Sequence, residues 1–419
     1  MKVKASIIAM GLAALASTHA FAQSVTGSSN ESATVLQIGD RNSATVDQQS
    51  SSGDIVSVTQ TANKATAIVT SQNGAGNLTS ITQSNPNGSG NDSNLAATVT
   101  QQQAVNEKNT ISQQGDNSST TVTQTASTGD TNTVGQVGTR NMATITQVGS
   151  AGNTVNIDQG TDKSAGPSNS AQAVVVQTDT VGNTLQITQG LAQGYADVAT
   201  IGAGYNNTAL TQSGGPTVAY VRQTAETGDT VSITQNGAEY ASVQSSNGVG
   251  NKTTISQDGA SDYNYALVAQ DQSSNENTTI SQSGLGGNTA QVSQFSGNND
   301  KMEVSQNGSF NDSTTVQQGG HFDVTSVAQT GTGNIANFTQ LFSDDSSILS
   351  TQNGSQNNAN GFQIGADESM TLAQDGTANR IIAMQSGSNN VAGITQFGSG
   401  NYANVSQTGN SNTASVKQR

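Results

Sequence analysis

Short segments of seven residues recur between residues 31 and 418, and within each segment the side chains alternate in character. The first position is usually Asn or an acid, the third is small or apolar, the fifth is aliphatic and the seventh is Gln, as in Asn141-MATIT-Gln147. The intervening positions carry mainly Thr and Ser. Because strand side chains point alternately to two faces, each segment is predicted to be a β-strand with positions one, three, five and seven inward.

The closing Gln residues keep a nearly constant spacing of 11 or 12 residues. Their series has 33 positions over Gln37–Gln418; it includes Gln72 and Gln318, and it passes through Ile201 and Ser245, where Gln is missing. A fixed period over this length indicates a repeat architecture, in which one structural unit stacks on the next.

Gly-containing connections of the form Q-x-G-x-x-N, here called arcs, join many of the segments. Examples are Gln136-VGTR-Asn141 and Gln407-TGNS-Asn412. Gly supplies the positive φ of a tight reversal, and Asn tolerates similar conformations. Pro86, Pro167 and Pro216 all fall between segments, as expected for a residue that cannot donate a hydrogen bond within a sheet.

Segments and arcs together predict an all-β fold, a β-solenoid of stacked two-strand coils with two facing parallel sheets. A seven-residue strand is about 23 Å long, and an arc of four or five residues returns the chain in the facing sheet. Two strands then form one coil of about 23 residues, and coils stack about 4.8 Å apart. The 33 segments predict about 16 coils over roughly 80 Å.

Stacking places the inward amides of successive coils above one another. Gln and Asn each offer two donors and an acceptor, so a column of them can form hydrogen bonds along the axis. A slip of one residue would turn amides and aliphatics outward together, which explains the strict spacing. The amides predicted to form this ladder include Asn42, Gln48, Asn141, Gln147, Asn153, Gln159, Asn183, Gln189, Asn251, Gln257, Asn288, Gln294, Asn334, Gln340, Asn390, Gln396, Asn401, Gln407, Asn412 and Gln418.

Two departures from the repeat carry structural expectations. The segment Tyr195–Ile201 is the weakest, because Asp197 would point inward and Gln is missing, so a local register shift or a looser loop is predicted there. The first inward position also accepts acids, which predicts that it lies near the margin of the sheet. The acids at this position are Asp54, Asp130, Asp229, Glu276 and Asp300.

The N-terminus predicts export. Lys2 and Lys4 precede the apolar run Ile7–Ala16 and the cleavage pattern Ala20-Phe21-Ala22, so residues 1–22 are predicted to be a signal peptide. Residues 23–30 form a short polar lead, and residues 31–419 the repeat solenoid. Removal of the signal peptide changes the formal net charge from −15 to −17, which argues against nucleic acid as a primary partner.

Composition excludes an ordinary globular core. The chain has 32% hydrophobic residues, no Trp and no Cys, so neither a large apolar core nor disulfides can hold it together. Backbone pairing must do so. Because the repeat continues to Gln418, the last coil is expected to leave its edge open, and an open edge adds further copies end to end.

The repeated Q-x-G-x-x-N arc, with alternating small and aliphatic residues and a second Gln, resembles the curlin repeat of curli fibre subunits, which are bacterial functional amyloids. The resemblance covers about residues 31–418. It implies an exported subunit that crosses the periplasm, leaves through an outer-membrane secretion channel and is nucleated by a second subunit. It further implies extracellular, fimbrium-like fibres that serve biofilm matrix, cell aggregation and adhesion to cells or abiotic surfaces.

Candidate chemistry is sparse, so we expect no enzyme activity, cofactor or metal. After signal removal His321 is the only His, and it lies in an arc, where a solvent-exposed loop residue is the simplest interpretation. Asp344 and Asp345 form an acidic pair in another arc, and no other ligand or catalytic group converges on them in the sequence.

Two other functional classes remain as alternatives. Thr-x-Thr pairs such as Thr121 with Thr123 and Thr144 with Thr146 could bind ice in a monomeric solenoid. Because they occur in successive segments, they are expected on both sheets, whereas ice binding needs one dedicated face. A monomeric solenoid adhesin or a polysaccharide-acting solenoid is the second alternative, and the absence of clustered aromatic residues from the sequence argues against a sugar-binding cleft.

Overall fold

A computed structural model of the chain describes residues 6–8, 20–85, 93–160, 168–190, 193–259 and 263–419. Every regular element in these residues is a β-strand. No helix in the described part has the length and apolar character needed to cross a membrane. The chain divides into two compact units, Met1–Gly215 (unit 1) and Pro216–Arg419 (unit 2).

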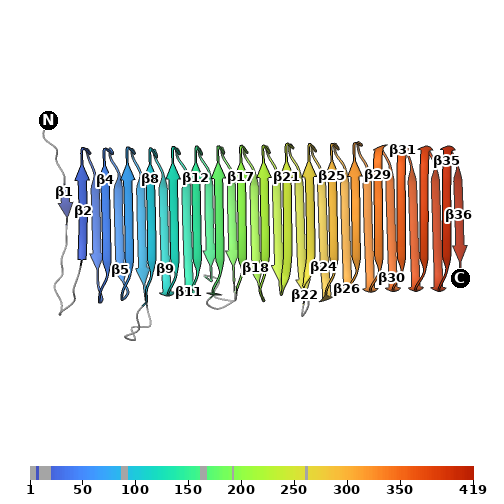
Figure 1. The fold of residues 1–419 in the computed structure, drawn as a ribbon, viewed down its shortest axis with the longest axis horizontal. Coiled ribbons are helices and arrows are strands. Elements are labelled where there is room, and N and C mark those ends of the chain that lie inside the picture. Colours follow the sequence, from blue (N-terminus) through green and yellow to red (C-terminus); the bar gives the residue numbers. More distant parts are fainter. Residues whose placement is uncertain (1–5, 9–19, 86–92, 161–167, 191–192, 260–262) are drawn as a thin grey trace. The chain divides into compact units, whose positions relative to one another are not determined.

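In unit 1 successive strands alternate between two parallel sheets, called sheet A and sheet B (Figure 1). Sheet A pairs, in order, β1 (Ser6–Ile8), β3 (Ser32–Gln37), β5 (Ile55–Thr61), β7 (Leu78–Ser84), β9 (Lys108–Asp116), β11 (Thr131–Thr139), β13 (Thr154–Gln159), β16 (Thr184–Gln189) and β18 (Asn207–Ser213), with β14 (Ser168–Asn169) beside the end of β11. Sheet B pairs β2 (Ala20–Thr26), β4 (Ser43–Gln49), β6 (Thr66–Gln72), β8 (Ala96–Gln102), β10 (Ser119–Thr125), β12 (Met142–Val148), β15 (Gln172–Thr178) and β17 (Tyr195–Ile201).

Unit 2 repeats this arrangement. Its own sheet A contains β20 (Thr230–Asn236), β22 (Lys252–Gly259), β24 (Asn277–Gly286), β26 (Lys301–Ser309), β28 (Val324–Thr332), β30 (Ser347–Ser355), β32 (Ser369–Thr377), β34 (Val391–Ser399) and β36 (Thr413–Gln418). Its own sheet B contains β19 (Val218–Thr224), β21 (Glu239–Ser246), β23 (Asn264–Asp271), β25 (Thr289–Phe295), β27 (Asp312–Gln318), β29 (Ile335–Asp344), β31 (Asn358–Ala366), β33 (Arg380–Ser388) and β35 (Tyr402–Asn410).

The predicted fold class is confirmed: each unit is a β-solenoid with two parallel sheets. A strand pairs with the strand two places on, so one strand from each sheet forms one coil, and the register aligns equivalent residues. In β10 and β12, for example, Val122 pairs with Ile145 and Gln124 pairs with Gln147. The interior between the sheets is thin and holds columns of Ala, Val, Ile and Gln, while Thr and Ser alternate outward.

Side-chain volumes in adjacent coils compensate for one another. Phe338 in β29 is 2% exposed and pairs with Gly361 in β31, where a Cβ atom would lie 2.7 Å from the Phe338 ring. Gly361 therefore provides the space for an aromatic ring that the usual Val or Ile would occupy. Close packing of this kind makes the interior sensitive to added atoms.

Three positions of the predicted Gln series are wrong by one residue. In β6, Ser71 is buried and Gln72 is half-exposed, because Ala67 and Val69 align with the Ala and Val columns of β4 and β8. In β27, Gln317 is buried and Gln318 is exposed. In β27 two adjacent Gln residues made the sequence ambiguous, whereas in β6 the predicted series followed Gln72 although the inward residue is the Ser before it. Pairing with neighbouring coils determines which residue points inward in both strands.

The third position lies in β17, where Thr200, and not Ile201, occupies the inward position opposite Gln177 of β15. The expected local register shift is absent, because β17 pairs with β15 without interruption from Tyr195 to Ile201. Asp197 points outward and Val198 fills the interior. The observed register removes the one interior acid that the sequence had placed in the middle of a strand.

The arcs differ in detail from their prediction. Where successive ladder Gln residues of unit 2 lie 11 residues apart, the strand continues through the Gly of the arc. For example, β35 runs to Asn410, and the turn consists of Ser411 and Asn412. Gly409 has a φ of 105°, and Ser411, which precedes the Asn, has a φ of 58°. The left-handed residue is thus the one before Asn, and Asn412 itself is not left-handed.

Several N-terminal and proline predictions are outside the residues described. Pro86, Pro167 and most of the predicted signal peptide lie there, whereas Pro216 lies outside any strand, just before β19. Strand β2 crosses the predicted cleavage site and stacks on β4, with Val25 opposite Gln48. The division into signal peptide, lead and solenoid stays a prediction.

Candidate functional site

The inward Gln side chains of sheet A form a continuous hydrogen-bonded column in unit 1. Each Nε2 donates to Oε1 of the Gln in the next coil, with N–O distances of 2.7–2.9 Å. Most also donate to a backbone carbonyl of the facing sheet, as Gln136 does to Ser119 at 3.1 Å. The column contains Gln37, Gln60, Gln83, Gln113, Gln136, Gln159, Gln189 and Gln212.

Sheet A of unit 2 carries a column of the same kind, with N–O distances of 2.7–3.0 Å. Its members are Gln235, Gln257, Gln282, Gln306, Gln329, Gln352, Gln374, Gln396 and Gln418. One amide proton therefore joins neighbouring coils, and the second joins the two sheets, as Gln352 does through Ile335 at 2.8 Å. A buried amide with both protons and its oxygen engaged is stabilising, whereas an unpaired one would be costly.

The Gln columns of sheet B are shorter. In unit 1 the column runs through Gln101, Gln124, Gln147 and Gln177, and in unit 2 it runs through Gln270, Gln294, Gln317, Gln340, Gln363, Gln385 and Gln407. Ser71, Thr200 and Ser245 replace Gln at the equivalent position in three other strands. The two sheets of a unit are therefore not equivalent, a difference that sequence spacing did not indicate.

Asn side chains form columns at the two edges where arcs turn. Arcs from sheet A to sheet B make edge 1, and arcs from sheet B to sheet A make edge 2. In unit 2 the Oδ1 of each edge 1 Asn accepts the backbone N–H of its equivalent in the next coil, at 3.0–3.2 Å. This column contains Asn264, Asn288, Asn311, Asn334, Asn357, Asn379 and Asn401.

Within each unit the predicted ladder residues are distributed over four kinds of column, one at each edge and one in each sheet. Asn42, Asn141, Asn288, Asn334 and Asn401 lie at edge 1, and Asn153, Asn183, Asn251, Asn390 and Asn412 lie at edge 2. Gln159, Gln189, Gln257, Gln396 and Gln418 lie in sheet A, and Gln48, Gln147, Gln294, Gln340 and Gln407 lie in sheet B. All are buried except Asn401, Asn412 and Gln418, which are half-buried.

Acids replace Asn because the column needs an acceptor at this position. At edge 2 of unit 1, Oδ1 of Asp54 accepts the N–H of Asn77 at 2.9 Å, and Oδ1 of Asn77 accepts the N–H of Glu107 at 3.0 Å. The second carboxylate oxygen meets a hydroxyl: Ser71 donates to Asp54 and Ser150 donates to Asp130. The acids lie at the strand margin, as predicted, yet they are 2% exposed or less.

Burial raises the pKa of the stacked acids at edge 2 of unit 2. Glu276, Asp300 and Asp323 occupy successive coils, and each accepts the backbone N–H of the residue that follows it in the column. Loss of solvation, together with the charge of neighbouring acids, raises the pKa of Glu276 to about 9, of Asp300 to about 7 and of Asp323 to about 6. The column therefore favours protonated side chains.

Some buried polar residues of the interior were not predicted. The third position of the segment, expected to be small or apolar, holds Asn109 and Asn132 in unit 1 and Thr278 and Thr325 in unit 2. Each donates to the Oε1 of a ladder Gln in sheet B, as Thr325 does to Gln340 at 2.6 Å. The sequence already shows each of these residues as a polar side chain at a position predicted to point inward.

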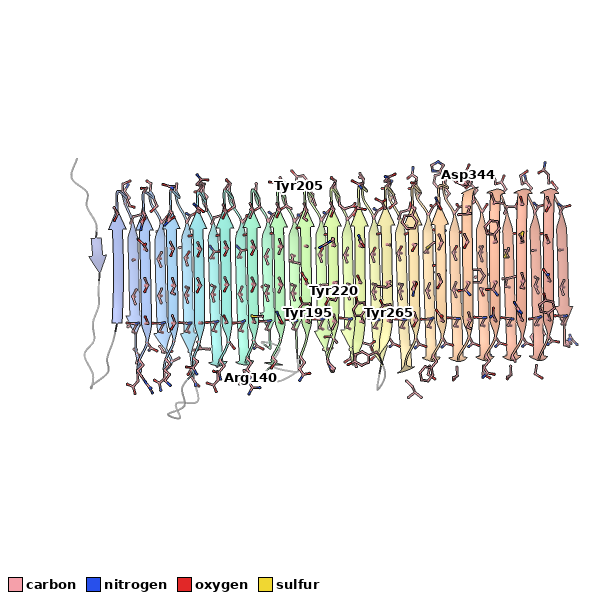
Figure 2. All side chains as sticks on the ribbon, viewed as in Figure 1. Arg140, Tyr195, Tyr205, Tyr220, Tyr265 and Asp344 are labelled. Carbon is pink, nitrogen blue, oxygen red and sulfur yellow. The ribbon has the colours of Figure 1, made fainter. Side chains whose placement is uncertain are left out.

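The remaining candidate groups lie on the outside of the molecule. His321 forms an isolated parallel bridge with Asp344 at edge 2 of unit 2, where Figure 2 shows Asp344. Within the described residues, no three His, Asp or Glu side chains are arranged to hold a metal ion. In sheet B of unit 2, Tyr240 and Tyr265 stack with ring centroids 4.6 Å apart, and Tyr220 lies 5.8 Å from Tyr240. The expectation of no clustered aromatics is therefore wrong for this outer face.

The last coil, formed by β35 and β36, has a hydrogen-bonded neighbour on one side within the described chain. The backbone N–H groups of Asn401 and Asn412 donate to Oδ1 of Asn379 and of Asn390 in the preceding coil, at 3.0 and 2.9 Å. The last described coil is therefore joined to its neighbour by the same bonds that join the earlier coils of unit 2.

A family model matches the C-terminal part of the chain. The curlin associated repeat matches residues 376–409 and 394–419, a region that contains β33, β34, β35 and β36. A search of curated proteins found no match. The same inward Gln and edge Asn recur in the preceding coils of unit 2 and in unit 1, outside the matched residues. The chain therefore carries curlin repeats at residues 376–419.

Proposed function

We propose that this protein is a structural subunit that self-assembles into extracellular, curli-like cross-β fibres, and that it is not an enzyme. The observation that carries the proposal is the equivalence of successive coils. The hydrogen bonds of one coil to the next use the same atoms throughout each column, as in Gln374 to Gln396 at 3.0 Å and Gln396 to Gln418 at 2.7 Å. A second molecule can therefore add to a coil by the contacts that already join coils within one chain.

The chemistry of the columns gives this addition a direction. Each Gln donates forward through Nε2, and each edge Asn accepts forward through Oδ1. An incoming coil must supply a Gln oxygen and a backbone N–H at matching positions, which another copy of the same repeat does. Growth with parallel, in-register strands is the result expected.

The biological setting is part of the proposal. Export through the periplasm, passage through an outer-membrane channel and nucleation by a partner subunit follow from the curlin resemblance, which the family match at residues 376–419 supports. The fibre would contribute to biofilm matrix, cell aggregation and adhesion to surfaces.

Assembly of the purified chain tests the proposal. The mature protein, transferred from denaturant to buffer, is expected to polymerise after a lag that preformed fibres abolish. Gln407→Lys with Gln418→Lys should slow elongation, because stacked like charges would replace an amide column. A monomer that stays stable with concentration and seeding would overturn the proposal.

A further inference from the structure

One outer face of unit 1 is uncharged over five consecutive strands. The outward positions of β6, β8, β10, β12 and β15, all in sheet B, are twenty residues, and ten of them are Thr. None of the twenty is Asp, Glu, Lys or Arg, and each is half-exposed or exposed. We call this surface the Thr face.

The Thr face is regular because the strands are in register. Thr98, Thr121 and Thr144 align across β8, β10 and β12. Thr100, Thr123 and Thr146 form a second column beside them, and both columns continue into Val side chains in β15. Columns of β-branched residues give a flat surface of repeated methyl groups, on which Thr hydroxyls can bond to one another across strands.

Sheet A of the same unit has no equivalent surface. Its outward positions include Lys108 in β9 and Asp158 in β13. Two copies of a chain with a formal net charge of −15 repel each other over most approaches. The Thr face lacks that local repulsion, and small β-branched side chains in register are the kind that interdigitate between paired sheets.

We propose that the Thr face is the lateral contact between two fibres of this protein, in which sheet B of one copy packs on sheet B of another. The inference rests on the proposed self-assembly, since it concerns how assembled chains associate sideways. The occupant is a second copy of this chain, presented through the same face.

The size of the Thr face predicts when this contact forms. Five strands spaced about 4.8 Å apart and about 23 Å long cover roughly 550 Å² per copy. A stable interface buries about 800 Å² per partner, so two free monomers are not expected to stay paired. Along a fibre, however, the contact repeats once per chain and the contributions add. Lateral pairing should therefore follow elongation and not precede it.

Paired Lys substitutions on opposite faces of unit 1 test the inference in the full-length mature chain. The test variant is Thr121→Lys with Thr123→Lys, on the Thr face. The matched control is Ser80→Lys with Thr82→Lys, which places the same charges on outward positions of β7 in sheet A. A second test variant, Thr121→Glu with Thr123→Glu, keeps the test valid if Lys impairs folding.

Mass per unit length, measured by scanning transmission electron microscopy, is the readout, with elongation kinetics recorded on the same samples. Wild-type and control fibres should have about twice the mass per length of Thr-face variants, at unchanged elongation rate. Equal mass per length in test and control fibres would overturn the lateral contact. Failure of every sample to elongate would instead contradict the proposed assembly.

A different ligand for the Thr face would also overturn the inference. If dispersed wild-type monomer inhibits ice recrystallisation, and the Thr-face variant loses this activity without a change in fibre mass, the face binds ice and is not a lateral contact.

Discussion

The Ser71 hydroxyl donates a hydrogen bond to Oδ2 of Asp54 at 2.5 Å, from the position where the Gln column of sheet B is interrupted. Ser245, at the other Ser interruption, donates to Asp229 at 3.1 Å. In both places a buried acid has replaced Asn at the preceding edge, and a hydroxyl has replaced the Gln that follows. At each interruption the Ser hydroxyl therefore supplies a hydrogen-bond donor to a buried carboxylate. Each Ser–Asp pair can be tested by mutation.

We expect Ser71→Ala to lower the free energy of unfolding by about 1–3 kcal/mol, because one oxygen of buried Asp54 loses its donor. In an Asp54→Asn background the same change should cost less, since no charge is left without a partner. Guanidinium unfolding of freshly refolded monomer measures both. Ser57→Ala, on the outer face of β5, is the control and should change stability by less than about 0.5 kcal/mol. Additive effects of the two mutations would contradict the coupling.

The register of β27 can be tested with adjacent amides. Gln317 is 1% exposed and donates to Gln340 at 2.8 Å, whereas Gln318 is exposed. Gln317→Glu removes a donor and places a carboxylate in the column, so it should cost about 3 kcal/mol or more and delay assembly. Gln318→Glu should leave both nearly unchanged. The reverse order of effects would show that the inward residue is Gln318.

The arc Gly residues of successive coils in unit 2 lie so close together that a side chain at these positions would clash with the next coil. Gly354 has a φ of 112°, and a Cβ atom there would overlap the carbonyl oxygen of Gly376 in the next coil. Gly354→Ala should therefore destabilise the solenoid more than Gly333→Ala. Gly333 has a φ of 67° and space around it, so its substitution costs only the left-handed strain of about 1–2 kcal/mol. Thermal unfolding of the two variants provides the comparison, and equal losses would argue against close Gly contact between coils.

Stability should fall as pH rises, which is the opposite of ordinary carboxylate behaviour. Glu276 and Asp300 have pKa values raised by burial to about 9 and about 7, so the folded state holds protons that the unfolded chain releases near pH 4. Their contribution is complete below about pH 4 and is lost progressively up to about pH 9. Unfolding midpoints measured across this range should decline.

Neutral variants provide the control for this pH dependence. Glu276→Gln with Asp300→Asn should flatten the decline, because the titrating groups are removed. Glu303→Gln, in an exposed pair with Lys301 at 3.3 Å, should leave the decline intact. A wild-type stability that rises between pH 5 and pH 8 would contradict the burial of these acids in protonated form.

The fold class could be predicted because two regular patterns run along the whole repeat. Alternation within a segment indicated the two faces of each strand, and the 11- or 12-residue spacing of the segments indicated the coil. The prediction failed at Gln318, which follows another Gln, and at Gln72, where the inward residue is Ser71; in both strands only the pairing of neighbouring coils selects the inward residue. Alternation within a segment is too weak a signal to resolve a shift of one residue when polar side chains occupy both candidate positions.

The amide core was predictable in composition but not in connectivity. Spacing identified the inward residues, yet it could not show that Asn153 and Asn334 belong to different edges. Nor could it show that an acid and a Ser 17 residues later form one unit, as Asp54 and Ser71 do. Such contacts depend on which coils are neighbours, which is a property of the assembled solenoid.

In the proposed fibre, molecules add to one another as coils add within a chain, with strands perpendicular to the fibre axis. X-ray diffraction from aligned fibres of the mature protein measures this arrangement. Such stacking predicts a sharp reflection near 4.7–4.8 Å on the meridian, parallel to the fibre axis, and a diffuse reflection near 10 Å on the equator. A strand-spacing reflection on the equator, or none in well-aligned fibres, would contradict it.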